Sequence, residues 1–456
     1  MSTTFARRSA VALTALFVMG CTSDTPAGES IAGADLQPPR LTTTQLADPN
    51  GVIVTVNSMG ADGSVPLDML QEVARQHAVV TYVDPFSKLT VVKGLTNEAA
   101  LRKIGSIDQV MPNLEFRLDT DQSAAHFFSV DPRQQNLPLV RASNAWATPH
   151  NGANVNVCII DSGIDDTHPD LAGRVSKAIN LVNTTAANAD GNGHGTHVAS
   201  TVVSNGIGMA SVAPDASLMN ARTFDNAGGG ATANVVLSAI RWCGREGAHV
   251  INMSLGFGAG VPLTSANQPL IAAFQAAINE VRLGTDPANS GSGGTVVVAS
   301  AGNSNLRFPS TRAVVVPGGL TGVITVGSTS RSSNVRSVFS NRGTFVDMYA
   351  PGSNILAVCS TFTTNCLGGT IRRLPGTTTN TGRYMEISGT SMAAPHVAGV
   401  AAIAFSRLGT TRTPSLGERV ENCLLNISRI TGQVPQLPDP ASARVDALLA
   451  ATSPSC

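Results

Sequence analysis

Two mostly apolar runs predict strands buried inside a parallel sheet, and each leads to a polar side chain. Residues 155–160 run into Asp161 and a glycine turn, and residues 296–299 lead to Asn303. Strands covered on both faces read as near-continuous apolar runs, which is typical of α/β proteins. In open α/β sheets the ligand crevice lies where strands end and the following helices begin. We therefore expect both side chains at such a crevice, although Asp161 alone could be a helix cap.

Two predicted helix starts add a base and a hydroxyl at comparable positions. His194 stands where an apolar helical pattern begins within residues 191–199, and Ser391 stands at the start of another within residues 388–399. Backbone N–H groups at a helix start have no partner inside the helix and can stabilise an anion. Taken separately, His194 could be a surface histidine and Ser391 the N-cap of a buried helix. Together with Asp161 they favour nucleophilic catalysis by a serine.

Four sequence blocks around these residues, taken in order, resemble the subtilisin-like serine proteases (subtilases, peptidase family S8). The blocks are Asp-Ser-Gly-Ile, His-Gly-Thr-His-Val-Ala, Ala-Gly-Asn and Gly-Thr-Ser-Met-Ala-Ala-Pro-His, and the similarity runs from Leu137 to Val445. The resemblance implies a three-layer subtilisin-like α/β fold with a mostly parallel central sheet. It also implies a serine endopeptidase that cleaves peptide bonds through an acyl-enzyme, with Ser391 as nucleophile and His194 as base. Asp161 would orient the imidazole, and Asn303 would hold the oxyanion together with the N–H of the nucleophile.

The same resemblance implies which segments hold a peptide substrate. Such substrates add a strand to exposed backbone edges, so small residues are expected where the peptide backbone approaches. The candidate substrate-binding residues are Gly228, Gly229, Gly230, Ser254, Leu255, Gly256, Ser300, Ala301 and Gly302. We expect no cofactor for catalysis and no certain metal ligand. Structural calcium is common in the family and could take oxygens from Asp165, Asp170 and Asp190.

The charge balance excludes partners that need a strong electrostatic field. Charged residues make up 13% of the chain, with 30 basic and 30 acidic residues. This balance gives no field that would steer nucleic acid or an anionic membrane. We therefore expect protein or peptide substrates, no nucleic acid, and a monomer.

The N-terminus predicts export and a lipid anchor. Residues 1–20 contain Arg7 and Arg8 before an apolar run that is too short to span a bilayer, as in a signal peptide. The run ends in Val-Met-Gly-Cys, which resembles the bacterial lipoprotein cleavage box with Cys21 as the acylated residue. An ordinary secretory signal that contains a cysteine is the alternative. Residues 21–50 would be a flexible tether, and the protein would stay lipid-anchored in the cell envelope or be secreted after processing.

Residues 51–116 predict a small domain of their own. Their apolar patterning gives the order strand, helix, strand, strand, helix, strand, which is the ferredoxin-like split motif. The domain is similar to the inhibitor I9-type propeptide of many subtilases, which blocks the cleft until it is removed; an unrelated small binding domain is the alternative. Residues 117–136 would be the processing linker and residues 137–456 the catalytic domain. The chain would then be a zymogen that processes itself.

The cysteines predict two disulfides. The chain has 7 cysteines, and if Cys21 carries lipid the others lie in an oxidising compartment. The suggested pairs are Cys359–Cys366, around a short loop, and Cys423–Cys456, at the C-terminal tail. Cys158 in the central strand and Cys243 in an apolar helix are interpreted as buried free thiols, although six cysteines allow fifteen connectivities.

Two functions are compatible with these features. The first is an exported, self-processed serine endopeptidase. The second is a lipid-anchored binding protein on the same scaffold, without turnover. None of the four expected catalytic positions departs from the family pattern, so we favour the enzyme.

Overall fold

The structure is a computed structural model of the whole chain. It describes residues 51–456 except 61–62, 85–87, 115–116, 119–133, 230, 258–259, 287–292, 309–312, 365, 374–381, 431–442 and 455. The predicted signal peptide, the tether with Cys21, most of the predicted processing linker, and Gly230 therefore lie outside the described residues. None of the described helices is long and apolar enough to cross a membrane.

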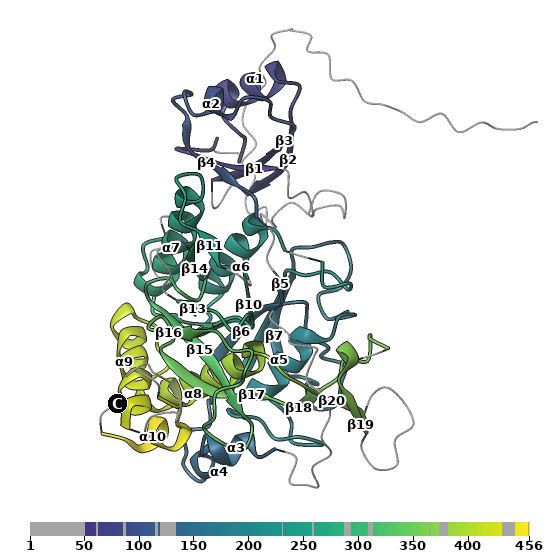
Figure 1. Cartoon of the computed structure of the whole chain (residues 1–456), viewed down its shortest axis with the longest axis vertical. Coiled ribbons are helices and arrows are strands. Elements are labelled where there is room, and N and C mark those ends of the chain that lie inside the picture. Colours follow the sequence, from purple (N-terminus) through teal and green to yellow (C-terminus); the bar gives the residue numbers. More distant parts are fainter. Residues whose placement is uncertain are drawn as a thin grey trace, which may run out of the picture. The chain divides into compact units, whose positions relative to one another are not determined.

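The N-terminal domain folds in the predicted order of strands and helices. Its elements are β1 Val52–Val56, α1 Leu67–Arg75, β2 Val79–Asp84, β3 Leu89–Lys93, α2 Glu98–Leu101 and β4 Ile107–Pro112. The four strands form an antiparallel sheet in the order β2-β3-β1-β4 (Figure 1). Val54 on the sheet packs with Met69 of α1 and Leu101 of α2 in one apolar cluster. The prediction of a small α+β domain is confirmed.

The rest of the chain is organised by one parallel sheet of seven strands. Their spatial order is β17-β15-β12-β9-β6-β8-β7, and every pairing between neighbours is parallel. In that order the strands are Met348–Ser353, Val323–Ser330, Val296–Ser300, Val250–Met253, Asn156–Asp161, Ser217–Arg222 and Val175–Asn180. The carboxyl ends of parallel strands share one edge of the sheet, so Asp161 at the end of β6 lies at that edge.

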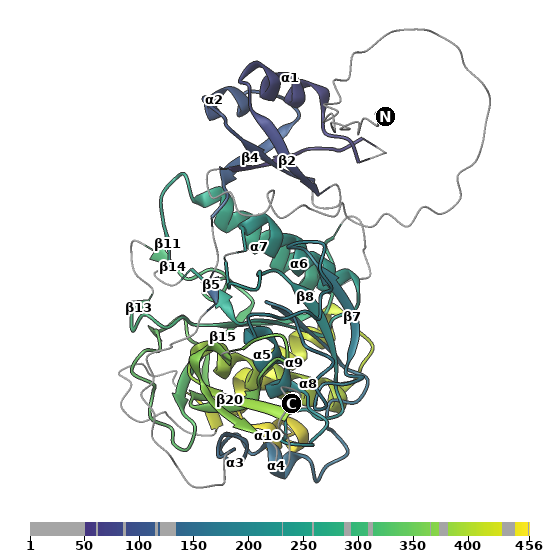
Figure 2. The same cartoon turned by 90° about the vertical axis from the view of Figure 1, so that its right-hand side faces the viewer.

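Helices cover both faces of this sheet. They are α5 His194–Val202, α6 Ala233–Arg245, α7 Gln268–Leu283, α8 Thr390–Leu408 and α9 Pro414–Ile430. Val157 and Ile159 of β6 share a core with α5 and α8, whereas Cys158 and Ile160 share a separate core with α6 and α7. Helices α6 and α7 lie side by side (Figures 1 and 2). The predicted three-layer α/β fold is confirmed.

Shorter elements surround the three layers. The helices are α3 Asn136–Leu139, α4 Ala142–Ala145, η1 Cys366–Gly368 and α10 Ala447–Thr452. The strands are β5 Arg117–Leu118, β10 Leu255–Gly256, β11 Val261–Pro262, β13 Arg307–Phe308, β14 Ala313–Val314, β16 Arg342–Gly343, β18 Ile355–Val358, β19 Thr370–Arg373 and β20 Arg383–Ile387. Strands β18, β20 and β19 form a separate antiparallel sheet.

Disulfides join the cysteines of the described residues in three pairs. Two of them, Cys359–Cys366 and Cys423–Cys456, are the pairs suggested by the sequence. The interpretation of Cys158 and Cys243 as free thiols is wrong, because these residues form a disulfide with their Cα atoms 6.0 Å apart. Cys158 belongs to the face of β6 that α6 covers, and Cys243 is on the buried side of α6. Packing of these two elements brings together thiols that are 85 positions apart.

Candidate active site

Asp161 and His194 form a buried hydrogen-bonded pair. Strand β6 ends at the carboxylate and α5 begins at the histidine. Nδ1 of His194 lies 2.8 Å from Oδ1 and 3.0 Å from Oδ2 of Asp161, and both side chains are at most 1% exposed. Since a carboxylate only accepts hydrogen bonds, Nδ1 carries the proton that it donates, which leaves Nε2 as the acceptor of the neutral ring. A side chain at Gly195 would collide with the backbone oxygen of Gly163, so glycine permits this close approach.

Ser391 lies in the first turn of α8 and is tied to the turn that follows β9. Its Oγ donates a hydrogen bond to the backbone oxygen of Ser254 at 3.0 Å, and Oγ of Ser254 donates to the backbone oxygen of Ser391 at 2.8 Å. Helices α5 and α8 pack against each other, so the serine and His194 come from adjacent elements. Nε2 of His194 is buried and has no hydrogen-bond partner among the described residues.

Asn303 follows β12 and contacts the residue before Ser391. Its Oδ1 accepts hydrogen bonds from N of Thr390 at 2.9 Å and from Oγ1 of Thr390 at 2.8 Å. Because Oδ1 accepts from both donors of Thr390, Nδ2 is the amide group that remains to bind another partner. Nδ2 is buried without a partner among the described residues. Other buried side chains also have an atom without a partner among the described residues, such as Oδ1 of Asn252, so Nδ2 of Asn303 and Nε2 of His194 matter because they belong to expected catalytic residues.

One of the three expected substrate-binding segments adjoins Ser391. Within Ser254–Gly256, Ser254 makes the two bonds described above, and Leu255 and Gly256 form β10. Strand β5 pairs antiparallel with β10, with Leu255 opposite Leu118. The segment that precedes the catalytic domain therefore adds a strand to this edge, as expected for an extended peptide.

The other two expected segments lie at different parts of the site. Ser300 ends β12, and the N–H of Gly302 donates to Oγ1 of Thr390 at 3.1 Å. Gly228 has a φ of 72°, and a Cβ added there would lie 2.7 Å from Nδ2 of Asn192, two residues before His194. Gly302 therefore contacts the residue before the serine, and Gly228 lies close to the turn before the histidine. N of Gly229 donates to Oδ1 of Asp225 at 2.8 Å, within the same turn.

The three carboxylates considered for calcium do not fit such an ion. Asp165, Asp170 and Asp190 are buried, and both oxygens of each accept hydrogen bonds from hydroxyl or backbone N–H groups. A calcium ion would have to displace these donors. In the described part of the chain, no group of three or more His, Cys, Asp or Glu side chains could hold a metal.

Two further histidines are buried on α5 and α8. Nε2 of His197 donates to a backbone oxygen of β18 at 2.9 Å. Nδ1 of His396 donates to the backbone oxygen of Met392 at 2.9 Å, and its Nε2 accepts from the amide of Asn136 at 2.8 Å. Burial lowers the pKa of His197 to about 3 and the pKa of His396 to about 4. Both rings are therefore neutral groups that hold structure.

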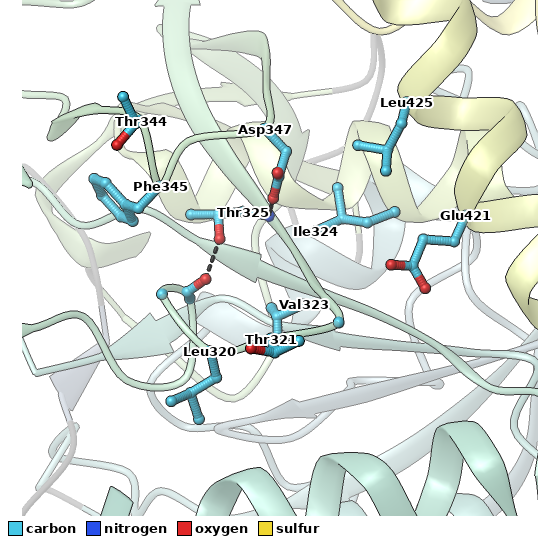
Figure 3. Close-up of a pocket in the computed structure, with 13 residues that line it drawn as sticks. Leu320, Thr321, Val323, Ile324, Thr325, Thr344, Phe345, Asp347, Glu421 and Leu425 are labelled. Atoms are coloured by element: carbon cyan, nitrogen blue, oxygen red, sulfur yellow. Dashed lines mark hydrogen bonds between the residues drawn. The ribbon is translucent and has the colours of Figure 1, made fainter. Parts of the chain in front are cut away.

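A cavity of about 230 Å³ lies at the start of β15, and none of the expected site residues lines it (Figure 3). Asp347 and Glu421 contribute carboxylates to its wall. Asp347 accepts a hydrogen bond from N of Thr325 at 2.8 Å, and Glu421 forms an ion pair with Arg282 at 2.6 Å. Because both carboxylates already have protein partners, we assign this cavity no part in the reaction.

Comparison with known sequences identifies relatives of the larger domain. The profile of the Subtilase family (Peptidase_S8) matches residues 152–427, which is more than half of the chain. Subtilisin DY from Bacillus licheniformis is 34% identical over 293 residues, which cover 64% of this chain and 91% of the relative. Thermitase from Thermoactinomyces vulgaris is 35% identical over 278 residues, which cover 60% of this chain and 83% of the relative.

Solved structures share the fold of this chain. A cold adapted subtilisin-like serine proteinase aligns with a TM-score of 0.50 and 31% identity, covering 66% of this chain and 91% of the other. Fervidolysin from Fervidobacterium pennivorans aligns with a TM-score of 0.62 and 23% identity, covering 89% of this chain and 61% of the other. At that identity the second alignment supports the fold alone.

Proposed function

The chain belongs to the Subtilase family of subtilisin-like serine proteases, and from this we propose that it is an exported serine endopeptidase made as a self-processed zymogen. Ser391 is the nucleophile, His194 the general base and Asp161 the residue that orients the imidazole. Asn303 donates to the oxyanion. The substrates are proteins or peptides.

The proposed reaction begins when the hydroxyl of Ser391 turns from Ser254 to Nε2 of His194. The imidazole takes the hydroxyl proton while Oγ bonds to the carbonyl carbon of the peptide. The carbonyl oxygen becomes an oxyanion, which Nδ2–H of Asn303 and the N–H of Ser391 stabilise. The imidazolium then gives its proton to the leaving amine and an acyl-enzyme forms. Water repeats these steps and releases the acid.

One observation carries this proposal: each of two expected catalytic residues has a buried polar atom without a partner among the described residues. Nε2 of His194 is an acceptor that lacks a donor, and Nδ2 of Asn303 is a donor that lacks an acceptor. Leaving such atoms unpaired costs about 1–3 kcal/mol each in desolvation. Attack of Ser391 on the substrate carbonyl would supply a partner for each atom. Nε2 of His194 would take the hydroxyl proton, and Nδ2 of Asn303 would donate to the oxyanion. This complementarity supports proteolysis over a binding role without turnover.

Contacts of the N-terminal domain support its role as an inhibitor. Strand β5, which directly follows the N-terminal domain, occupies the edge of β10, where a peptide substrate is expected to pair. The hydroxyl of Tyr82 lies 3.1 Å from Oγ of Ser238 on α6, and the N–H of Ala233 donates to the backbone oxygen of Leu114 at 2.9 Å. We infer that residues 51–116 block the cleft until a bond within residues 117–136 is cut. The lipid anchor at Cys21 is part of the proposal and rests on the sequence.

The test compares the unsubstituted precursor with Ser391→Ala by intact mass, with and without a fluorophosphonate probe. We expect the unsubstituted chain to lose its N-terminal domain and to gain one probe mass, because only an activated serine reacts. Ser391→Ala should do neither. Absence of both cleavage and labelling in a folded, unsubstituted chain would favour the lipid-anchored binding protein. Loss of membrane association in Cys21→Ser tests the anchor separately.

A further inference from the structure

A second buried carboxylate, Asp190, is bonded to both segments that carry the histidine and its acidic partner. Its side chain is fully buried. Oδ1 accepts hydrogen bonds from Oγ of Ser162 at 2.9 Å and from N of Gly193 at 2.8 Å. Oδ2 accepts from N and Oγ1 of Thr196 at 3.0 Å and 2.5 Å. Among the described residues no Lys or Arg forms an ion pair with it, and besides the four donors the buried guanidinium of Arg222 acts on it electrostatically.

These four bonds come from residues that adjoin His194 and Asp161 in the sequence. The residue before His194 and the second residue after it both donate to Asp190, so the carboxylate holds the backbone on either side of the ring. Ser162, which follows Asp161, donates to the same carboxylate and accepts the N–H of Gly195 at 2.9 Å. The turn after β6 and the first turn of α5 are therefore joined through one side chain.

We propose that Asp190 is a positioning residue that fixes the ring of His194 against Asp161. The inference rests on the proposed function, since it concerns the base of that reaction. Each oxygen of Asp190 accepts from one backbone N–H and one hydroxyl, so a carboxylate satisfies all four partners. An asparagine would turn an NH₂ group toward one of the backbone N–H groups and push the segments apart. A misplacement of about 1 Å in a reacting group costs up to about 10²-fold in rate.

Burial and hydrogen bonding act on this carboxylate in opposite directions. Burial raises the pKa of Asp190 above its ordinary value, and the bonds from Thr196, Gly193 and Ser162 oppose that rise. The four donors therefore offset part of the cost of ionising a carboxylate in this position. Removing one donor should weaken the arrangement without removing the carboxylate.

Asp170 is a matched control for this substitution. It is also fully buried. Its four donors are Oγ of Ser204 at 2.8 Å, N of Ile207 at 2.7 Å, N of Gly208 at 3.0 Å and the hydroxyl of Tyr384 at 2.6 Å. None of these donors adjoins Asp161 or His194 in the sequence. Asp170→Asn therefore reports the general cost of disturbing a buried carboxylate.

The experiment compares full-length Asp190→Asn and Asp170→Asn with the unsubstituted chain. Each is matured in trans by tagged unsubstituted enzyme, which is then removed, and kcat and KM are normalised to sites titrated with fluorophosphonate. The low-field ¹H NMR signal of the His194 Nδ1 proton is recorded on the full-length chain. We expect Asp190→Asn to lower kcat by about 10- to 100-fold, with little change in KM, and to move the NMR signal. Asp170→Asn should lose comparable stability while kcat and the signal stay unchanged.

Equal losses of kcat in the two variants would overturn the proposal, as would an unchanged kcat and NMR signal in Asp190→Asn. If Asp190→Asn does not fold, Ser162→Ala removes one of the four bonds and should shift the same signal with a smaller loss of kcat. A folded unsubstituted chain without turnover would contradict the proposed function instead. The NMR comparison would then still decide whether Asp190 holds the histidine.

Discussion

The two sides of the candidate site differ in how far their hydrogen bonds already match the proposed reaction. We call Asp161 and His194 the base side, and Ser391 and Asn303 the nucleophile side. On the base side, Nδ1 of His194 lies 2.8 Å and 3.0 Å from the two carboxylate oxygens. On the nucleophile side, Oγ of Ser391 donates to Ser254, and Nδ2 of Asn303 has no partner among the described residues.

This difference indicates that the base side is organised before a substrate arrives, whereas the substrate completes the nucleophile side. The hydroxyl of Ser391 must leave the oxygen of Ser254 before it can reach the imidazole. In the proposed reaction the amide of Asn303 gains its acceptor only when an oxyanion forms, so its interaction would favour the transition state over the bound substrate. Changes on the two sides should therefore have different signatures.

The largest effect expected is on the scaffold of the base side. The Cys158–Cys243 disulfide ties β6, which ends at Asp161, to α6 across 85 positions. Chain-entropy arguments give about 4–5 kcal/mol of stability for a loop of this length. We expect the double variant Cys158→Ala/Cys243→Ala, made in Ser391→Ala to prevent self-digestion, to lose about that much in urea unfolding.

The matched control is the short Cys359–Cys366 disulfide, which spans 7 positions. The same argument gives about 2 kcal/mol for it. Equal losses of unfolding free energy in the two double variants would show that loop length does not determine how much each disulfide stabilises the chain. The disulfide from β6 to α6 would then stabilise the base side no more than a short disulfide does.

The next largest effect is expected on the nucleophile side. Asn303→Leu removes the proposed donor to the oxyanion, and we expect kcat to fall by about 10²–10³-fold, the loss measured for an oxyanion-hole amide of subtilisin. KM should change little, because the donor acts only in the transition state. Steady-state kinetics on a peptide substrate measure both constants.

A second variant separates the lost donor from a disturbed Thr390. Asn303→Asp keeps an oxygen that can accept the N–H and hydroxyl of Thr390, but it has no N–H and adds a negative charge. It should lose at least as much kcat as Asn303→Leu. An Asn303→Asp enzyme with the kcat of the unsubstituted chain would contradict the proposed role of the amide.

The sequence predicted the positions of the site residues better than their contacts. Asp161 and Asn303 follow apolar strands, so the shared edge of a parallel sheet places them near each other. By contrast, the pairing of Cys158 with Cys243 depends on which helix covers which face of β6, and periodicity does not specify this. The bond from Ser391 to Ser254 depends on a side-chain rotamer, which the sequence does not encode locally.

Asp190 shows the same limit from another direction. The sequence offered it only as a calcium ligand, because an acidic residue near other acidic residues fits that chemistry. Its role depends on donors from Ser162 and Thr196, which lie 28 and 6 positions away. The sequence feature that could have indicated this role is its position four residues before His194. The glycine-rich turn between them brings the carboxylate back toward the start of the helix.

The smallest effect expected is a pH dependence of stability that both sides share. The helices of the two sides each carry a buried histidine, His197 on α5 and His396 on α8. Burial lowers the pKa of His197 to about 3 and the pKa of His396 to about 4, against 6.5 for an unperturbed histidine. Below pH 6.5 the unfolded chain therefore binds more protons than the folded chain. The stability that these two neutral histidines contribute is therefore complete above that pH and is lost as the pH falls toward 4.

Each histidine should contribute a slope of up to about 1.4 kcal/mol per pH unit in this window. In the Ser391→Ala chain, His396→Gln should flatten the slope of unfolding free energy against pH by about that amount, measured by urea unfolding at pH 7, 6 and 5. Below pH 4 only His197 still resists protonation, so the base side should govern the remaining loss. An unchanged slope in His396→Gln would mean that this ring takes up its proton in the folded chain over the same pH range as in the unfolded chain, and is protonated at pH 5. In that case the bond from Asn136 to Nε2 could not persist, because a protonated ring has no acceptor to offer.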